Sequence, residues 1–560
     1  MASAVREAAD LVIRSGSVVD GSGRAAFAAD VAVRDGRILA VGPFPGRGAR
    51  ELDASGRCVA PGFVDVHTHY DAQLCWDGLA TPSPLHGVTT VVTGNCSLSV
   101  APVRPEGVAR IVGMFQQIED VRERSFAAGV SFAWESFAEY LASLEGTLGV
   151  NLAPLVGHST LRLFAMGAAS QERAATDAEV AEMAALVRDA VRAGARGLSL
   201  SHLDVDEFMR PVPSRFADLR EKTALARAVV EAGGSVLETV PMAGDPDEFR
   251  ATIEELGEIS RASGILCMLQ PIIHYPPAGD LWERALGWID RECERGARVI
   301  GQASPRPFDQ NLRLDETFFT FFLIPSWGDV MRRPPEQRAK LLADPALRPR
   351  LVEEGMPLLA FFLEKTWIGA TRSAANRPLE GRRLPDVARE RGCTLVDALI
   401  EIALQDDLAT EFAIRGALHA DPDVVARILK HPRVLLGASD GGAHVSQFCG
   451  ASDPTLFLAS FVRERGDFAL EDAVHRLTGQ PAELFGLSGR RGRVAPGLAA
   501  DLVIFDPARV APGRETYVGD LPGGANRYVC EAVGIDRVLV AGEDTVVAGR
   551  YTAARPGRIA

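Results

Sequence analysis

The sequence predicts an α/β fold, in which a (β/α)8 barrel is joined to a small β-sandwich formed by the two ends of the chain. Eight apolar, β-branched segments alternate with helical stretches through the middle of the 560-residue chain, and each segment runs into polar or small residues. Short alternating strands occupy both ends. Repeated strand–helix units with buried strands are typical of a barrel of parallel strands.

The expected barrel strands follow the chain in order. They cover residues 63–67, 88–93, 152–156, 197–201, 235–238, 265–269, 298–300 and 433–437. The clearest helices between them cover 178–193 and 220–232, and a glycine follows each, Gly194 and a residue later Gly233, as is common at helix ends.

The domain boundaries follow from the same pattern. Residues 1–60 and 490–560 carry short strands that are too few at either end to bury a core alone, so we expect them to pair into one β-sandwich. The barrel is expected over 61–489. The long gap between strands seven and eight, about 302–432, is interpreted as an inserted helical lid or oligomerisation segment, and we expect a homo-oligomer.

Composition excludes several classes of partner. A net charge of −14 argues against nucleic acid and anionic membrane surfaces, because binding phosphates requires a basic face. No apolar run reaches the roughly 18 residues that a membrane helix needs. The eight cysteines form no paired framework, which suits a reducing compartment. The N-terminal segment meets polar residues too early for a signal peptide, so we expect a cytoplasmic protein.

Potential metal ligands stand where barrel enzymes place their chemistry, at the C-terminal ends of strands. His67 and His69 follow strand one and are two residues apart, so they share a face. Cys96 follows strand two, and Asp440 follows strand eight. Imidazole, thiolate and carboxylate are the ligands that zinc takes in proteins. Each residue alone has an ordinary structural explanation, but together they predict a metal site.

These motifs resemble those of the amidohydrolase superfamily, and most of all the D-aminoacylase (N-acyl-D-amino-acid deacylase) family. The resemblance spans nearly the whole chain and rests on the terminal β-segments, His67-Thr68-His69, Gly94-Asn95-Cys96, Val156-Gly157-His158-Ser159 and Ser439–His444. It implies hydrolysis of an amide carbon–nitrogen bond, other than a peptide bond, by a zinc-activated water. It also implies that His67, His69, Cys96 and Asp440 bind metal and that Asp440 carries the proton.

The chain departs from this family at strands five and six, where the family provides two histidines for a second metal. Here these strands contain Glu238 and Gln270 but no histidine. A second metal would need Glu238 or His202, which follows strand four. We therefore favour one Zn²⁺ per chain, held by His67, His69 and Asp440 with Cys96 close by.

A small-molecule amide is the expected substrate. His158 is expected to assist Asp440 in catalysis by stabilising the oxyanion, and Arg162, Arg306 and His444 are expected to bind the substrate. The guanidinium group matches the carboxylate of an N-acyl amino acid, and Arg215 is a further candidate for it. His274, His419, His431 and His475 are interpreted as structural.

Two other functions stay open at this point. The same site would suit a cyclic-amide hydrolase or, in reverse, a cyclase, although relatives of that kind carry a metal-bridging lysine at strand four, where this chain has serines and His202. The missing histidines would also suit an inert barrel that serves as a binding or scaffold protein. Finally, the aromatic run 318–327 predicts either a buried helix or a wall of the pocket that favours bulky apolar substrates.

Overall fold

The eight predicted barrel strands are present in the computed structural model, which describes residues 8–242, 245–316 and 318–560. Strand three is interrupted and forms two short pieces, β8 and β9. The barrel strands are β6 (Phe63–Asp65), β7 (Val88–Val91), β8 (Asn151–Leu152), β9 (Leu155–Gly157), β10 (Gly197–Ser201), β11 (Val236–Val240), β12 (Leu266–Leu269), β13 (Val299–Ala303) and β17 (Val434–Leu436).

Parallel hydrogen bonding closes these strands into a barrel. One run follows the order β17-β13-β12-β11-β10-β9 and a second follows β6-β7-β8. The Leu155 amide donates to the Thr93 carbonyl across 2.8 Å and joins the runs on one side. On the other side, the His69 amide donates to the Gly441 carbonyl across 2.7 Å. The predicted barrel is confirmed, and its first and last strands meet at the expected metal site.

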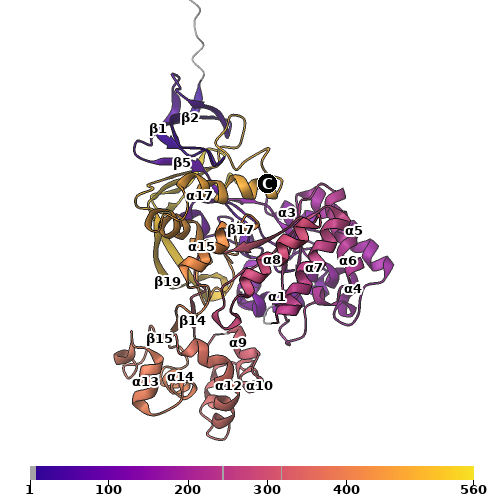
Figure 1. Ribbon diagram of the computed structural model, residues 1–560, viewed down its shortest axis with the longest axis vertical. Helices are drawn as coiled ribbons and strands as arrows, with labels where there is room; N and C mark the ends of the chain where they lie inside the picture. Colours follow the sequence, from indigo (N-terminus) through magenta and orange to yellow (C-terminus); the bar gives the residue numbers. More distant parts are fainter. Residues whose placement is uncertain (1–7, 243–244, 317) are drawn as a thin grey trace, which may run out of the picture.

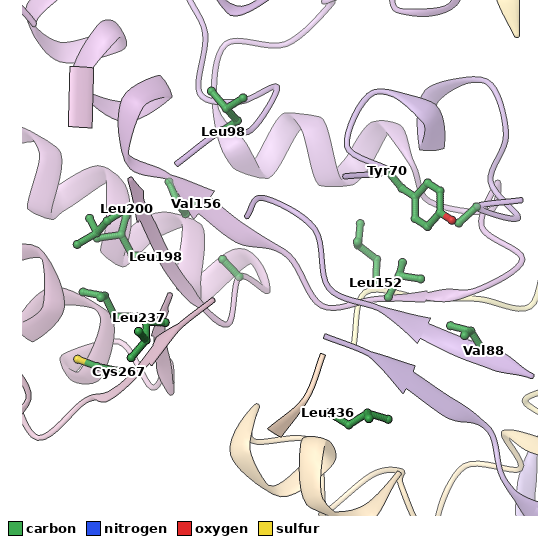
Figure 2. Packing of buried hydrophobic residues seen from close by; sticks show 14 of the residues in the cluster. Tyr70, Val88, Leu98, Leu152, Val156, Leu198, Leu200, Leu237, Cys267 and Leu436 are labelled. Atoms are coloured by element: carbon green, nitrogen blue, oxygen red, sulfur yellow. The ribbon is translucent and has the colours of Figure 1, made fainter. Parts of the chain in front are cut away.

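Helices surround the barrel, and the main hydrophobic core lies between them and the strands. Figure 2 shows Val156, Leu198, Leu200 and Leu237 among the side chains of this core; they come from the neighbouring strands β9, β10 and β11. The surrounding helices are α1 (Val108–Ile118), α2 (Glu123–Gly129), α3 (Phe137–Ser143), α4 (His158–Met166), α5 (Asp177–Ala193), α6 (Leu219–Glu231), α7 (Pro246–Ser263), α8 (Leu281–Glu294), α15 (Pro422–Lys430), α16 (Asp453–Leu456), α17 (Leu470–Leu477) and α18 (Gly479–Leu484).

Local sequence explains where the clearest helix begins and ends. Thr176 and Glu179 form a reciprocal capping box at the start of α5, which satisfies backbone amides that lack a partner within the helix. Gly194 follows the last residue of α5 with a φ of 132°, a backbone conformation that other residues rarely adopt. The observed helix therefore differs by one residue from the predicted range 178–193.

The two ends of the chain share one sheet of nine strands, with the order β23-β22-β21-β18-β5-β1-β2-β3 and β4 paired to β1. Figure 1 shows β1, β2 and β5 beyond one end of the barrel. The β-rich domain built from both ends is thus confirmed. Its strands are β1 (Ala9–Val18), β2 (Phe27–Arg34), β3 (Arg37–Gly42), β4 (Gly48–Asp53), β5 (Cys58–Pro61), β18 (Leu502–Phe505), β21 (Ile535–Val540), β22 (Glu543–Val547) and β23 (Arg550–Tyr551).

A separate hairpin, β19 (Ala511–Leu521) and β20 (Ala525–Val533), connects the C-terminal region to the inserted segment. The Tyr517 hydroxyl donates to Glu316 across 3.1 Å, and Arg313 donates to the Tyr528 hydroxyl across 3.2 Å. No sequence motif indicates this contact. It holds the insertion beside the open end of the barrel.

The insertion between β13 and α15 has a hydrophobic core of its own and lies apart from the helices around the barrel (Figure 1). It is mainly helical, as predicted, but it also contains a three-stranded antiparallel sheet with the order β14-β16-β15. Its elements are β14 (Gln310–Leu312), α9 (Phe319–Phe322), α10 (Pro325–Met331), α11 (Pro335–Leu342), α12 (Arg348–Leu363), β15 (Thr366–Ile368), α13 (Leu384–Arg391), α14 (Leu395–Leu404) and β16 (Phe412–Ile414).

The aromatic run mostly belongs to this separate core. Phe321 and Trp327 are fully buried and stack with their ring centroids 4.5 Å apart. Phe322 is also buried, whereas Leu323 is 54% exposed. Phe318 is buried in the same cluster and also lines the cavity described below. Packing therefore accounts for most of the run. Within the described ranges, no helix is both long enough and apolar enough to cross a bilayer.

Candidate metal centre and substrate pocket

His67, His69 and Cys96 converge at the open end of the barrel. One potential ligand atom from each residue lies within 4.8 Å of the others, and all three side chains are buried. The Nε2 atoms of the two histidines are 3.3 Å apart, and Cys96 Sγ is 3.6 Å from His67 Nε2 and 4.0 Å from that of His69. Asp440 Oδ1 lies 3.3 Å from His67 Nε2. The structure thus brings all four predicted metal ligands together.

The turn after strand two has a backbone that suits few side chains. Gly94 has a φ of 79°, and a Cβ added there would lie only 2.0 Å from the Leu155 carbonyl oxygen, so glycine is required. The Asn95 amide donates to the Thr68 and Val92 carbonyls, each across 3.1 Å, and ties this turn to strand one. Cys96 follows with a φ of 52°. The Gly-Asn-Cys sequence therefore places the thiol beside the histidines.

Strand eight ends in a turn of the same kind. The Ser439 hydroxyl lies 2.8 Å from each carboxylate oxygen of Asp65 and joins the ends of strands eight and one. Asp440 follows with a φ of 56°, in the left-handed region. Strained residues persist where surrounding structure over-determines them, and they gather at functional sites. This turn aims the Asp440 carboxylate at the histidines.

Strands five and six, which carry no histidine, contribute Glu238 and Gln270 to this end of the barrel. Val236 and Met268 belong to the cluster inside the barrel, so Glu238 and Gln270, two residues further on, point inward as well. The Cys96 amide donates to Glu238 Oε2, and the Gln270 amide donates to Cys96 Sγ, each across 3.3 Å. Both side chains therefore contact Cys96.

The pocket contains several buried carboxyl groups, and the positive charges near them are too few to neutralise them. Burial raises the pKa of Asp440 to about 6, of Glu119 and Asp204 to about 7 and of Glu238 to about 8. Burial also lowers the pKa of His67 well below its usual value, which leaves the imidazole neutral and able to bind metal. The pKa of the Cys96 thiol is raised well above its usual value by burial and then by Glu238.

A divalent cation fits this set of donors. It would supply the positive charge that the buried carboxylates lack, and it would favour the thiolate. Four buried side-chain atoms here also have no hydrogen-bond partner within the described part of the chain. They are the Nδ1 atoms of His67 and His69 and the Oε1 atoms of Glu119 and Glu238. Glu119 Oε1 lies 3.1 Å from His69 Nδ1, where a carboxylate orients a metal-binding imidazole.

A cavity of about 260 Å³ opens onto these side chains. His444 lines it, and its backbone amide donates to the Glu119 carbonyl across 2.7 Å. Glu119, Asp204 and Gln270 also line the cavity, although no sequence motif singled out a role for them. Gln270 was detectable in principle, because it directly follows strand six, at the end of the barrel where the site was expected.

Arg306 lies beside this cavity. It donates to Asp453 Oδ1 across 3.1 Å and to the Ser439 carbonyl across 3.3 Å, and its guanidinium packs over Phe448, which lines the cavity. Its Nη1 is buried without a hydrogen-bond partner in the described structure. Arg306 is not itself among the residues that line the cavity, but this Nη1 lies behind the Phe448 wall. Arg215, by contrast, donates to the Leu203 carbonyl across 3.0 Å.

His158 and Arg162 require a correction, because neither is among the residues that line this cavity. Both are fully buried: His158 Nε2 lies 2.9 Å from Glu221, and Arg162 forms an ion pair with the same carboxylate. Strand parity explains the error. Val156 belongs to the core outside the barrel, so His158, two residues later, also points outward and leads into α4.

His202 points outward for the same reason, since Leu200 belongs to the outer core. Its two ring nitrogens lie 2.9 Å from Thr239 Oγ1 and 3.0 Å from Glu255, and Lys222 is 3.1 Å away. It therefore offers no ligand to a second metal. Of the two suggested alternatives, only Glu238 lies beside the site.

Comparison with known proteins agrees with this geometry. A model described as "Amidohydrolase family" matches residues 50–552. The D-aminoacylase of Alcaligenes xylosoxydans xylosoxydans is 32% identical over 98% of this chain and 97% of its own length. An N-acyl-D-glutamate deacylase from Bordetella bronchiseptica, solved with zinc and a phosphonate mimic of the tetrahedral intermediate, is 29% identical over 99% of each chain, with a TM-score of 0.66.

A solved D-aminoacylase with a binuclear metal centre is also similar. It is 28% identical, covers 98% of this chain and 99% of its own, and has a TM-score of 0.66. In that protein one metal activates and the second attenuates.

Proposed function

The chain belongs to the amidohydrolase family, and we propose that it is a metal-dependent hydrolase of non-peptide carbon–nitrogen bonds that deacylates N-acyl-D-amino acids. The family resemblance inferred from the motifs is thereby confirmed. The observation that carries the proposal is the convergence of His67, His69, Cys96 and Asp440 at the mouth of the barrel, in a chain that aligns with a D-aminoacylase over nearly its full length.

One cation per chain, most simply Zn²⁺, is proposed to be held by His67, His69 and Asp440 with the Cys96 thiolate. When bound, it would lower the pKa of a water molecule and polarise the substrate carbonyl. Support for a single cation comes from Glu238 and Gln270, because each of these side chains forms a hydrogen bond with Cys96. The similar D-aminoacylase has a binuclear centre in which one metal activates and the second attenuates, so a single cation is compatible with activity.

Asp440 is proposed to act as general base and then as general acid. Its carboxylate lies 3.3 Å and 3.8 Å from the Nε2 atoms of His67 and His69, so it faces the place where the reacting water would be. It would accept the proton of that water and deliver it to the leaving nitrogen.

Arg306 and His444 are proposed to position the substrate. The free Nη1 of Arg306 suits a carboxylate oxygen, and the Asp453 carboxylate and the Phe448 ring fix the guanidinium in place. His444 lines the cavity near Glu119 and adds a second group that can donate to the substrate. The oxyanion role expected of His158 is not proposed again, because that imidazole contacts Glu221 outside the barrel.

A screen of N-acetyl-D- and N-acetyl-L-amino acids tests the proposal. We expect hydrolysis of D-substrates by the purified protein, its loss after removal of metal by a chelator, and its recovery when Zn²⁺ is added. An acetamide without a carboxylate should be a poor substrate. If the metal-loaded protein hydrolyses hydantoins or dihydropyrimidines but no N-acyl amino acid, the deacylase proposal is wrong and the cyclic-amide alternative is correct.

A further inference from the structure

A second cavity, of about 220 Å³, adjoins the pocket that contains the candidate metal ligands. Leu203, Val240 and Pro271 line both cavities, and these residues lie at or just after the ends of β10, β11 and β12. We call this second cavity the apolar annex. Its remaining wall includes Phe249 of α7 and Trp282 of α8. The two cavities therefore meet over strands four to six.

The apolar annex differs chemically from the pocket. Within the described structure no charged side chain lines it, whereas Glu119, Asp204 and Asp440 line the pocket. Phe249 and Trp282 are each 7% exposed, and Ile272, on the loop after β12, is 1% exposed. Such packed walls form a cavity that exists before a ligand arrives. Preformed apolar cavities favour apolar groups, because the affinity follows the apolar area removed from water.

The position of Arg306 gives the substrate a direction. Arg306 follows β13 and contacts Ser439 after β17 and Asp453, so the free donor for a carboxylate lies on the β13–β17 side. The apolar annex lies over β10 to β12, on the other side of β13 in the strand order. The candidate metal ligands and Asp440 are close to the pocket between them. A substrate whose carboxylate contacts Arg306 thus extends its acyl group toward the apolar annex.

We infer that the apolar annex binds the acyl chain of the substrate, so that the protein prefers medium-length aliphatic N-acyl-D-amino acids to N-acetyl ones. The inference rests on the proposed function, because it presumes a scissile amide at the candidate metal site. It assigns the preference for bulky apolar substrates, which the sequence had suggested for the aromatic run 318–327, to a different wall of the molecule.

Substitution of Ala278 provides the test. Ala278 lines the apolar annex at the end of a short 3-10 helix and is partly exposed, so Ala278→Phe fills the cavity without entering the packed core. The matched control is Ala262→Phe, at an exposed position of α7 outside the cavity. The substrates are the N-acetyl, N-butanoyl and N-hexanoyl derivatives of one D-amino acid, assayed with the zinc-loaded protein.

In the parent and in Ala262→Phe, kcat/KM should rise by about fourfold per added methylene until the cavity is full. In Ala278→Phe the rise should disappear, so that the N-hexanoyl substrate is hydrolysed no more efficiently than the N-acetyl one. Hydrolysis of the N-acetyl substrate with a flat series in the parent would overturn the inference and leave the proposed function intact. The same rise in all three proteins would also overturn it.

Binding of hexanoate, measured by calorimetry, separates the two claims if no N-acyl amino acid is hydrolysed. Hexanoate should bind the parent and Ala262→Phe and bind Ala278→Phe at least tenfold more weakly, by the loss of two or more buried methylenes at about fourfold each. That result without deacylase activity supports the apolar annex as a site for aliphatic chains and overturns the proposed function. Equal binding to all three proteins, or none to the parent, overturns the apolar annex.

Discussion

The side-chain amide of Gln270 donates a hydrogen bond to the Sγ atom of Cys96 across 3.3 Å. Gln270 comes from the end of strand six and Cys96 from the turn after strand two, so this contact crosses the mouth of the barrel. Glu238, from strand five, accepts the backbone amide of the same cysteine. Polar residues of the two strands that carry no histidine thus contact a candidate ligand of the metal site.

Metal content follows from this arrangement. We expect about one zinc per chain in the purified protein, because only one set of ligands is complete. Replacing both residues in Glu238→His/Gln270→His should raise the content to about two, since two imidazoles would then face Cys96. Glu238→Gln, which adds no imidazole, is the control and should stay near one. Elemental analysis measures all three, and two fully occupied metals in the untreated parent would refute the single-metal proposal.

Replacement of Asp440 by asparagine should leave the fold intact and reduce kcat by several orders of magnitude, because a ligand and a proton carrier are lost together. Asp329→Asn is the control, since that side chain is 70% exposed on the insertion. Steady-state kinetics and thermal unfolding measure the two effects. Activity within tenfold of the parent would assign the base to another carboxylate, with Glu119, 3.1 Å from His69, the first to examine.

Cys96→Ala should weaken metal binding and lower turnover if the thiolate is a ligand. Cys267→Ala is a matched control, because Cys267 is also buried but lies on the outer face of strand six. Both variants should lose some stability through the small cavity that alanine leaves. Competition with a chelator, followed by metal content, distinguishes them. Equal metal affinity in the two variants would show that Cys96 does not bind the metal and only packs against its neighbours.

Arg306 should select substrates with a free acid. In Arg306→Gln we expect a higher KM for an N-acyl-D-amino acid and a smaller change for the corresponding carboxamide, since only the acid loses its charged partner. The variant leaves Asp453 buried without its cation, so the double variant Arg306→Gln/Asp453→Asn is needed to restore stability. If the acid and the carboxamide lose the same factor in both variants, Arg306 does not bind the carboxylate.

Glu221 should stabilise the fold rather than serve catalysis. It is fully buried between His158 and Arg162, so Glu221→Gln should cost about 3–5 kcal/mol of unfolding free energy at neutral pH. Despite burial, which opposes it, contact with His158 and Arg162 lowers the pKa of Glu221 to about 2. The unfolded state then binds more protons than the folded state as the pH falls from about 4.5 toward 2, and stability decreases.

Denaturant unfolding as a function of pH tests this role. The parent should lose stability across that acid range, and Glu221→Gln should show a shallower loss because it lacks the titrating group. The fraction of Glu221→Gln that remains folded should have the same kcat as the parent. A large fall in kcat with unchanged stability would indicate that His158 and Glu221 take part in catalysis, which would contradict the structural role described above.

The barrel and its four candidate ligands were predictable because their signals are local. Each strand is a short apolar run, and in a parallel barrel all C-terminal strand ends gather at one edge. His67, His69, Cys96 and Asp440 directly follow such runs, so proximity in space follows from position in the chain. The shared sheet of the two ends was predictable in the same way, since neither end has enough strands to bury a core.

Side-chain direction and long-range partners were decided by the tertiary structure. His158 and His202 also follow strands, but the alternation within β9 and β10 directs them outward to Glu221 and Glu255. Their direction depends on which strand face is inside, and strands that are buried on both faces, as β9 and β10 are, do not reveal this. Glu119 reaches His69, and Gln270 reaches Cys96, only because distant segments pack together. The sequence alone determined which residues can bind a metal; packing determined which groups surround it.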